Sequence, residues 1–102
     1  MKKKTKPAAA THRAHVFYSG RVQGVGFRYT VEQMALDLGL GGWVKNLPDT
    51  RVELLCEGGK KEIENLLVSI KESTLGPHIK KVDCRWEEPT GKFTDFTVEF
   101  CL

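Results

Sequence analysis

The sequence lacks the features that would place the protein in a membrane or on an export route. No stretch of its 102 residues approaches the roughly 18 consecutive apolar residues that a membrane-spanning helix needs. The basic start leads into Pro7-Ala8-Ala9-Ala10-Thr11 and not into the apolar stretch of a signal peptide. We therefore expect a cytoplasmic protein that does not contact a membrane.

Cysteine is scarce, and its spacing does not suit a metal site. The chain has three cysteines, Cys56, Cys84 and Cys101, with neither a C-x-x-C pair nor a histidine at metal-ligand spacing. The odd number argues against a disulfide framework, although the spacing leaves a single disulfide open. We expect small core or edge residues at these positions, no metal and no cofactor.

Excess positive charge is absent outside the first residues. The 16 Lys and Arg and the 13 Asp and Glu residues give a formal net charge of +3. Residues 1–13 hold five basic residues and no acidic one, which leaves residues 14–102 with 11 basic and 13 acidic residues, a charge of −2. We predict a disordered basic arm over 1–13 and one folded domain over 14–102. A slightly acidic domain is a poor candidate for nucleic-acid binding.

Two segments have the periodicity of amphipathic helices. In residues 28–38 and again in 60–72, apolar residues recur at i, i+3, i+4 and i+7. Gly39 and the Leu75-Gly76-Pro77-His78 segment follow these stripes and are natural stops. The apolar positions are Val31, Met34, Ala35 and Leu38 in the first segment and Ile63, Leu66, Leu67 and Ile70 in the second.

The remaining segments have the character of strands. Residues 14–19 form one, and 42–47 and 51–57 form a hairpin joined by residues 48–50. Two later runs alternate cleanly, which predicts antiparallel strands with one buried face. Their apolar positions are Val82, Cys84 and Trp86, and Phe96, Val98 and Phe100. The order predicts an α+β, ferredoxin-like two-layer sandwich, βαββαβ plus a C-terminal strand, with two helices on one face of a mainly antiparallel sheet.

The connection between the first strand and the first helix has the composition of an anion-binding loop. Gly24 and Gly26 allow backbone N–H groups to turn inward as a nest, and the helix dipole adds positive potential there. The loop is not a Walker A motif, because the Lys-Ser/Thr is missing, nor a dinucleotide fingerprint, because Tyr29 replaces the third glycine. A tight turn without a ligand would use the same glycines.

Arg28 favours the anion-binding interpretation. A cation in the first turn of a helix faces the positive end of the dipole, which costs about 0.3–1 kcal/mol unless an anion lies between them. Its planar guanidinium also fits a phosphate better than a lysine ammonium does. An arginine that turns to solvent or pairs with a carboxylate is the alternative, and the neighbouring loop favours phosphate.

Two motifs, one in this loop and one in the predicted hairpin, match a known family. The first, G-x-V-Q-G-V-x-F-R, runs from Gly20 through Arg28, preceded by Tyr18 where an aliphatic residue is usual. The second, G-W-V-x-N-x-x-x-G-x-V with a glycine six positions on, departs only at Thr50. Its matching residues are Gly42, Trp43, Val44, Asn46, Val52 and Gly58. Over about residues 14–100 the sequence resembles the acylphosphatase family, which hydrolyses carboxyl phosphates.

The resemblance implies a site and a mechanism. Arg28 would hold the phosphoryl oxygens together with the backbone N–H groups of the loop, and Asn46 would orient the attacking water. The water's proton would pass to the substrate's own phosphate, with no metal and no covalent enzyme intermediate. Because a carboxylate leaving group has a conjugate acid with a pKa of about 4, it departs without a proton donor. The phosphate-binding residues implied are Gln23, Gly24, Val25, Gly26, Phe27 and Arg28.

Thr50 stands where the family has a glycine. A β-branched residue adopts positive φ poorly, so we expect a turn of another type or a strained one.

We expect Trp43 and Trp86 to be sheet or core aromatics.

Two other functions are compatible with the sequence. One is a non-catalytic phosphate- or acyl-phosphate-binding domain, similar to the first domain of larger carbamoyl-transfer maturation proteins. The other is RNA binding on a ferredoxin-like sheet, whose aromatic motif is absent here. The enzyme is the prediction that we carry forward, acting as a monomer on a small-molecule acyl phosphate.

Overall fold

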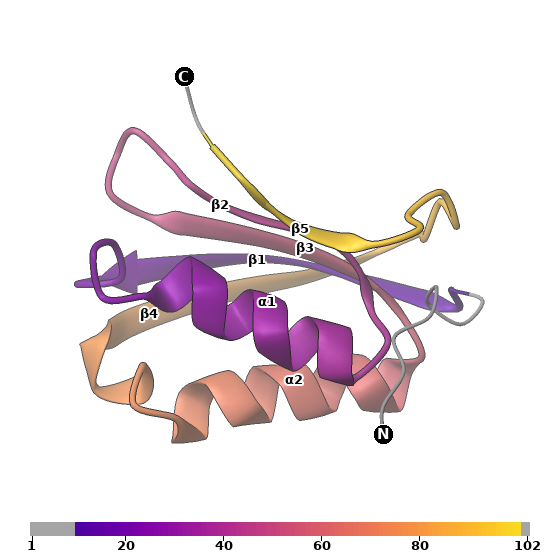
Figure 1. Ribbon diagram of the computed structural model, residues 1–102, viewed down its shortest axis with the longest axis horizontal. Helices are drawn as coiled ribbons and strands as arrows, with labels where there is room; N and C mark the ends of the chain where they lie inside the picture. Colours follow the sequence, from indigo (N-terminus) through magenta and orange to yellow (C-terminus); the bar gives the residue numbers. More distant parts are fainter. Residues whose placement is uncertain (1–9, 101–102) are drawn as a thin grey trace.

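The computed structural model describes residues 10–100 (Figure 1). They form a five-stranded sheet that two helices cover on one face. In chain order the elements are β1 (His12–Gly20), α1 (Phe27–Asp37), β2 (Gly41–Asn46), β3 (Val52–Gly58), α2 (Lys60–Glu72), the short 3-10 helix η1 (Gly76–His78), β4 (Ile79–Glu87) and β5 (Phe96–Glu99). The predicted ferredoxin-like βαββαβ order with an additional C-terminal strand is confirmed.

The strand order β4-β1-β3-β2-β5 brings three chain segments to one end of the sheet. Val52 of β3 lies opposite Tyr18 of β1 on one side and Asn46 of β2 on the other. β5 runs parallel to β2, with Glu99 beside Lys45. The loop before α1, the β2–β3 turn and the end of β5 therefore lie on the same side of the molecule, the left in Figure 1.

The core lies between the sheet and the two helices, as the apolar stripes predict. Val31 and Ala35 of α1 are fully buried, while Met34 and Leu38 pack against the core at its margin. In α2 the fully buried side chains are Ile63, Leu66 and Ile70. The 3.6-residue period thus identified the buried faces correctly, because each helix contacts the sheet along one stripe.

β1 begins two residues before the predicted boundary at Ala14. His12 pairs with Gly58, and Arg13 forms ion pairs with Glu57 and Glu87 on the two neighbouring strands. His12 and Arg13 therefore belong to the sheet and not to the predicted arm. Their partners lie far away in the sequence, so the local pattern could not reveal them. Residues 1–9 of the predicted arm lie outside the described residues.

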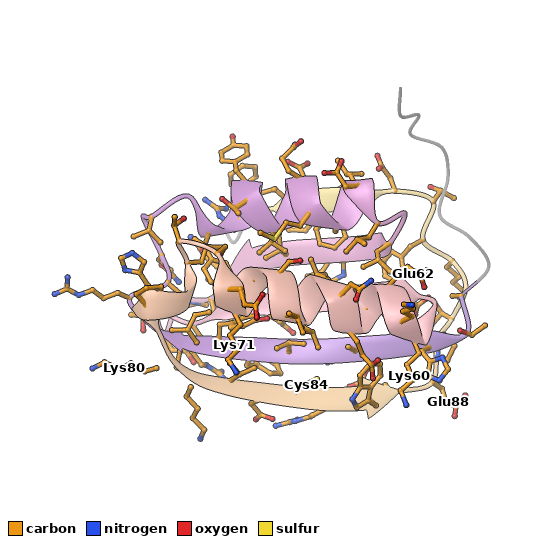
Figure 2. All side chains as sticks on the ribbon, turned by 90° about the horizontal axis from the view of Figure 1, so that it is seen from below. Lys60, Glu62, Lys71, Lys80, Cys84 and Glu88 are labelled. Carbon is orange, nitrogen blue, oxygen red and sulfur yellow. The ribbon has the colours of Figure 1, made fainter. Side chains whose placement is uncertain are left out.

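The predicted buried face of β4 is wrong. Val82 is 51% exposed and Trp86 46% exposed, and Cys84 is exposed as well. The alternation itself was predicted correctly, because all three side chains lie on the face of the sheet that the helices cover elsewhere. However, β4 is an edge strand, and in Figure 2 it lies beyond the part of the sheet that α2 covers. Trp86 is therefore a sheet aromatic but not a core residue.

A buried carboxylate holds the loop that leads into β5. Glu57 is only 2% exposed and accepts hydrogen bonds from the backbone N–H groups of Thr90 (2.8 Å) and Gly91 (2.9 Å). Arg13 supplies the opposite charge at 3.3 Å. Because this carboxylate is both paired and hydrogen-bonded, it anchors the loop firmly and so helps to place β5.

The β2–β3 turn keeps a left-handed residue at the position of the family glycine. Thr50 has a φ of 81°, and its N–H donates to the carbonyl of Leu47 (3.2 Å). The Asp49 carboxylate accepts hydrogen bonds from the Arg51 side chain at 2.9 Å and from the Arg51 backbone N–H at 3.2 Å, and these bonds lower the pKa of the Asp49 carboxyl. The turn thus places threonine in a conformation that strains a β-branched residue, which is one of the two outcomes expected from the sequence.

Replacing Thr50 with glycine is expected to raise the free energy of unfolding by about 0.5–1 kcal/mol. A left-handed conformation costs a residue with a Cβ about 1–2 kcal/mol, and the greater freedom of glycine in the unfolded chain offsets part of the gain. Urea unfolding measures the difference. Thr50→Asn, which tolerates this conformation better than threonine, should fall between the two. A less stable Thr50→Gly variant would show that contacts of the threonine outweigh its strain.

Candidate active site

The two sequence motifs meet at a small hollow on the side of the molecule where β1 and β2 end. Its volume is about 150 Å³. Arg28 enters it from the first turn of α1, and Asn46 from the last residue of β2. The other lining residues are Val22, Gly24, Gly26, Phe27 and Tyr29. The hollow therefore joins the anion-binding loop to the predicted water-orienting residue.

The loop's glycines are needed for backbone conformation. Gly24 and Gly26 have φ angles of 80° and 77°, in the left-handed region that disfavours a Cβ. A Cβ on either would contact no other atom within 4 Å, so close packing is not the reason for glycine. Gly26 is also the N-cap of α1. Within residues 10–100, no backbone N–H from Gln23 to Arg28 donates to another backbone group, so these donors are available to an anion.

Arg28 is held by β5 without losing its charge. Its Nη1 donates to the Glu99 carbonyl at 3.2 Å, and its guanidinium carbon lies 5.0 Å from the centroid of the Phe100 ring. No carboxylate forms an ion pair with Arg28 anywhere in the described part of the chain. The alternative of an arginine neutralised by a carboxylate is thus not found there. Nothing in the sequence pointed to Glu99 or Phe100 as its supports.

Asn46 carries an orphaned acceptor. Its side-chain Oδ1 is buried and has no hydrogen-bond partner among residues 10–100. A buried polar atom of this kind normally has a protein or water partner, because leaving it unpaired costs about 1–3 kcal/mol. A water in the adjoining hollow would supply that partner. This property makes Asn46 more than the first residue of a turn.

The side chain of Gln23 has a role that was not predicted, in addition to the phosphate contact expected of its backbone N–H. It does not line the hollow, and neither does Val25, which is 37% exposed. Instead, the Gln23 side-chain Nε2 donates to the carbonyls of Leu47 and Arg51, both at 2.9 Å. These two hydrogen bonds tie the loop to the hairpin that carries Asn46. This side-chain role could not be predicted from the sequence, because both acceptors are backbone atoms.

Gln23→Met is expected to lower kcat ten- to hundredfold and to change KM less. Methionine keeps the length of the side chain but removes both hydrogen bonds, so the hairpin loses its connection to the loop. Misplacement of a reacting group by about 1 Å can cost about a hundredfold in rate. Steady-state hydrolysis of an acyl phosphate measures the effect. The matched control is Gln33→Met, on the exposed face of α1, which should leave kcat unchanged. A Gln23→Met variant with normal kcat would contradict the positioning role.

The described part of the chain contains neither a cluster of metal-ligand side chains nor a membrane-spanning helix. Within residues 10–100, no three His, Cys, Asp or Glu side chains gather as metal ligands, and no helix is long and apolar enough to cross a membrane. Burial raises the pKa of the Cys56 thiol to about 12, so this thiol is protonated at neutral pH.

Comparison with known proteins agrees with the two motifs. The family model described as Acylphosphatase matches residues 14–98. The chain belongs to the acylphosphatase family. An acylphosphatase from Roseiflexus sp. is 42% identical over 86 residues, which are 84% of this chain and 92% of the relative. The family, the enzyme class and the fold expected from the sequence are thus confirmed.

Solved structures of acylphosphatases have the same fold as this chain. The acylphosphatase of Bacillus subtilis superposes with a TM-score of 0.81 and 30% identity, covering 87% of this chain and 99% of that one. HypF from T. kodakarensis also matches, with a TM-score of 0.69 and 29% identity over 88% of this chain. That match covers only 12% of HypF. The acylphosphatases, which match over nearly their whole length, favour the enzyme over the binding-domain alternative.

Proposed function

We propose that acyl phosphate hydrolysis by this acylphosphatase takes place in the hollow between Arg28 and Asn46. The proposal rests on two groups that line one hollow of about 150 Å³. Within residues 10–100, Arg28 has no carboxylate partner and Asn46 Oδ1 has no hydrogen-bond partner. The first attracts an anion and the second accepts a hydrogen bond from water. Together they can hold both reactants of a phosphoryl transfer to water.

In the binding step, the phosphoryl oxygens accept hydrogen bonds from Arg28 and from the backbone N–H groups of Gln23 to Arg28. The positive end of the α1 dipole acts on the same group. These donors are already oriented, so they stabilise the charge that spreads over the phosphoryl oxygens in the transition state without having to reorganise. The contacts of Arg28 with Glu99 and Phe100 support this preorganisation by restricting the guanidinium.

In the chemical step, Asn46 Oδ1 accepts a hydrogen bond from a water that attacks phosphorus. The bond between phosphorus and the acyl oxygen breaks, and the carboxylate leaves with the electron pair of that bond. The proton released by the water passes to a phosphate oxygen. A neutral amide suits this role better than a carboxylate, which would repel the anionic substrate. No general acid is needed, because the leaving carboxylate is weakly basic.

Turnover of benzoyl phosphate, with and without inorganic phosphate, tests the proposal. We expect hydrolysis that inorganic phosphate inhibits competitively, because both anions occupy the same loop. A phosphate monoester with an alkoxide leaving group should be hydrolysed far more slowly, since no acid protonates that group. A folded protein that binds phosphate but does not hydrolyse benzoyl phosphate would support the non-catalytic binding domain instead.

The proposed enzyme works as a cytoplasmic monomer on a small-molecule acyl phosphate, without nucleic acid or membrane as a partner. The hollow contains a cation for the phosphate and an acceptor for the water, so a second copy is not needed for the reaction. Cys84 carries an exposed thiol, which suits a reducing compartment. Sedimentation of the active enzyme and fractionation of the source cells test these two points.

A further inference from the structure

A second and larger hollow lies between α2 and the edge strand β4. This groove has a volume of about 490 Å³, within the range of small-molecule sites. One wall is formed by Leu67 and Val68 of α2, and the other by Ile79 and Val82 of β4. Val68 and Val82 are 52% and 51% exposed, so both present apolar surface to whatever enters the groove. Neither residue belongs to the Arg28–Asn46 hollow.

The charge around the groove has one sign. Among the described residues, its charged lining residues are Lys71, Lys80 and Lys81, and no acidic residue lines it. In Figure 2, Lys71 lies on α2 and Lys80 at the start of β4, and both residues line the groove. None of the three forms an ion pair with another residue in 10–100. A ligand that complements the groove would therefore carry an anionic group near the lysines and an apolar part against the apolar lining residues.

Tyr18 adds a polar group to that floor. It is only 2% exposed, lines the groove, and stands where the family motif has an aliphatic residue. Its ring packs against Phe27 at 5.1 Å between centroids. Burial raises the pKa of this phenol, so its hydroxyl is protonated at neutral pH. A protonated hydroxyl can donate to a ligand, which an aliphatic residue could not do.

We propose that the groove between α2 and β4 binds an amphiphilic anion, a hydrocarbon chain with a carboxylate or phosphate head group. The chain lies along Leu67, Val68, Ile79 and Val82, and the lysines hold the head. A protein strand added to the edge of β4 fits less well, because the alternating charges of Lys81, Asp83 and Arg85 are typical of edges protected against pairing. The groove is separate from the catalytic hollow, so this ligand does not compete with an acyl phosphate.

The test is a titration with decanoate below its micellar concentration, followed by two-dimensional NMR of the ¹⁵N-labelled protein. We expect shifts at Val68, Lys71 and Val82, and no shift at Asn46. Affinity should rise by up to about fourfold for each CH₂ added from hexanoate to decanoate, as more apolar surface is buried. Decyl phosphate should bind in the same place, and comparison with decanoate shows which head group is preferred. Decylammonium, with the same chain and the opposite charge, should not bind.

Variants separate the chain and head-group contributions. Val82→Asp places a negative charge in the groove and should weaken decanoate binding at least tenfold, while benzoyl phosphate hydrolysis stays unchanged. The double variant Lys71→Gln/Lys80→Gln should weaken it about five- to tenfold and reduce its dependence on salt. Thr94→Asp adds the same charge in the exposed β4–β5 loop and should leave binding unchanged.

Several results would overturn the proposal. Equal affinity for decanoate and decylammonium would show that the lysines do not select an anion. Absence of shifts, or shifts confined to the Arg28–Asn46 hollow, would show that the groove holds no such ligand. A wild-type dimer in sedimentation velocity that Val82→Asp dissociates would assign this face to a second copy of the chain. Because hydrolysis is measured separately, none of these outcomes depends on the catalytic assignment.

Discussion

Replacing Arg28 with alanine is expected to lower kcat/KM for benzoyl phosphate by about 10³- to 10⁵-fold. Removal of an arginine that stabilises the transferred phosphoryl group has an effect of this size in phosphoryl-transfer enzymes. In this protein the guanidinium is positioned by the Glu99 carbonyl and by Phe100, and the described residues offer it no carboxylate partner. Its loss removes the cation that lines the hollow and leaves the backbone donors of the loop, so the inhibition constant of inorganic phosphate should rise as well.

Two further variants make this measurement specific. Arg28→Lys keeps the charge but not the planar pair of donors, and should recover only part of the activity. Arg85→Ala removes the same charge from the exposed surface of β4 and should leave kcat/KM within twofold of wild type. Thermal unfolding of each variant checks that the fold is intact. An Arg28→Ala enzyme that is folded and retains more than a tenth of the wild-type kcat/KM would rule out the proposed phosphate site.

Asn46→Ala is expected to lower kcat by about 10²- to 10⁴-fold while phosphate still binds. Its Oδ1 has no hydrogen-bond partner within residues 10–100 and so is free to orient the water. Alanine removes this acceptor but not the donors that hold the phosphoryl oxygens. The inhibition constant for inorganic phosphate should therefore change less than threefold. This separation of turnover from binding distinguishes Asn46 from Arg28.

The control for this variant is Asn65→Ala, on the exposed face of α2. It should have no effect on kcat. Asn46→Asp has nearly the same shape but adds a negative charge beside the phosphate, so we expect it to lose both turnover and phosphate affinity. Normal turnover in Asn46→Ala, measured on folded protein, would contradict the assigned role and leave the water to be oriented by another group.

Much of the fold could be predicted from the sequence because its elements are locally consistent. The stripes containing Val31 and Ile63 have the helical period, and each helix packs on the sheet along that stripe. Gly26 precedes α1 because a left-handed residue is needed there. The loop and the hairpin also carry enough specific positions for the family to be identified before the fold is known.

Predictions failed where a partner lies far away in the sequence. The alternation of Val82, Cys84 and Trp86 correctly places three side chains on one face, but it does not tell whether a helix covers that face. The alternation of apolar residues indicates which face of the sheet a side chain lies on. Whether that face is buried depends on the position of the strand in the sheet. For the same reason the sheet begins at His12, two residues before the predicted boundary.

Residue types and their spacing establish which groups are available for chemistry: a glycine-rich loop, an arginine in the first turn of a helix and an asparagine at the end of a strand. Their arrangement into one site depends on how the strands and helices pack. Pairing of β3 with both β1 and β2 brings Arg28 and Asn46 to one hollow, and Gln23 and Glu99 fix them there through backbone carbonyls. Such contacts have no sequence signature, because every residue carries a carbonyl, and only the packing of strands and helices determines which of them a side chain can reach.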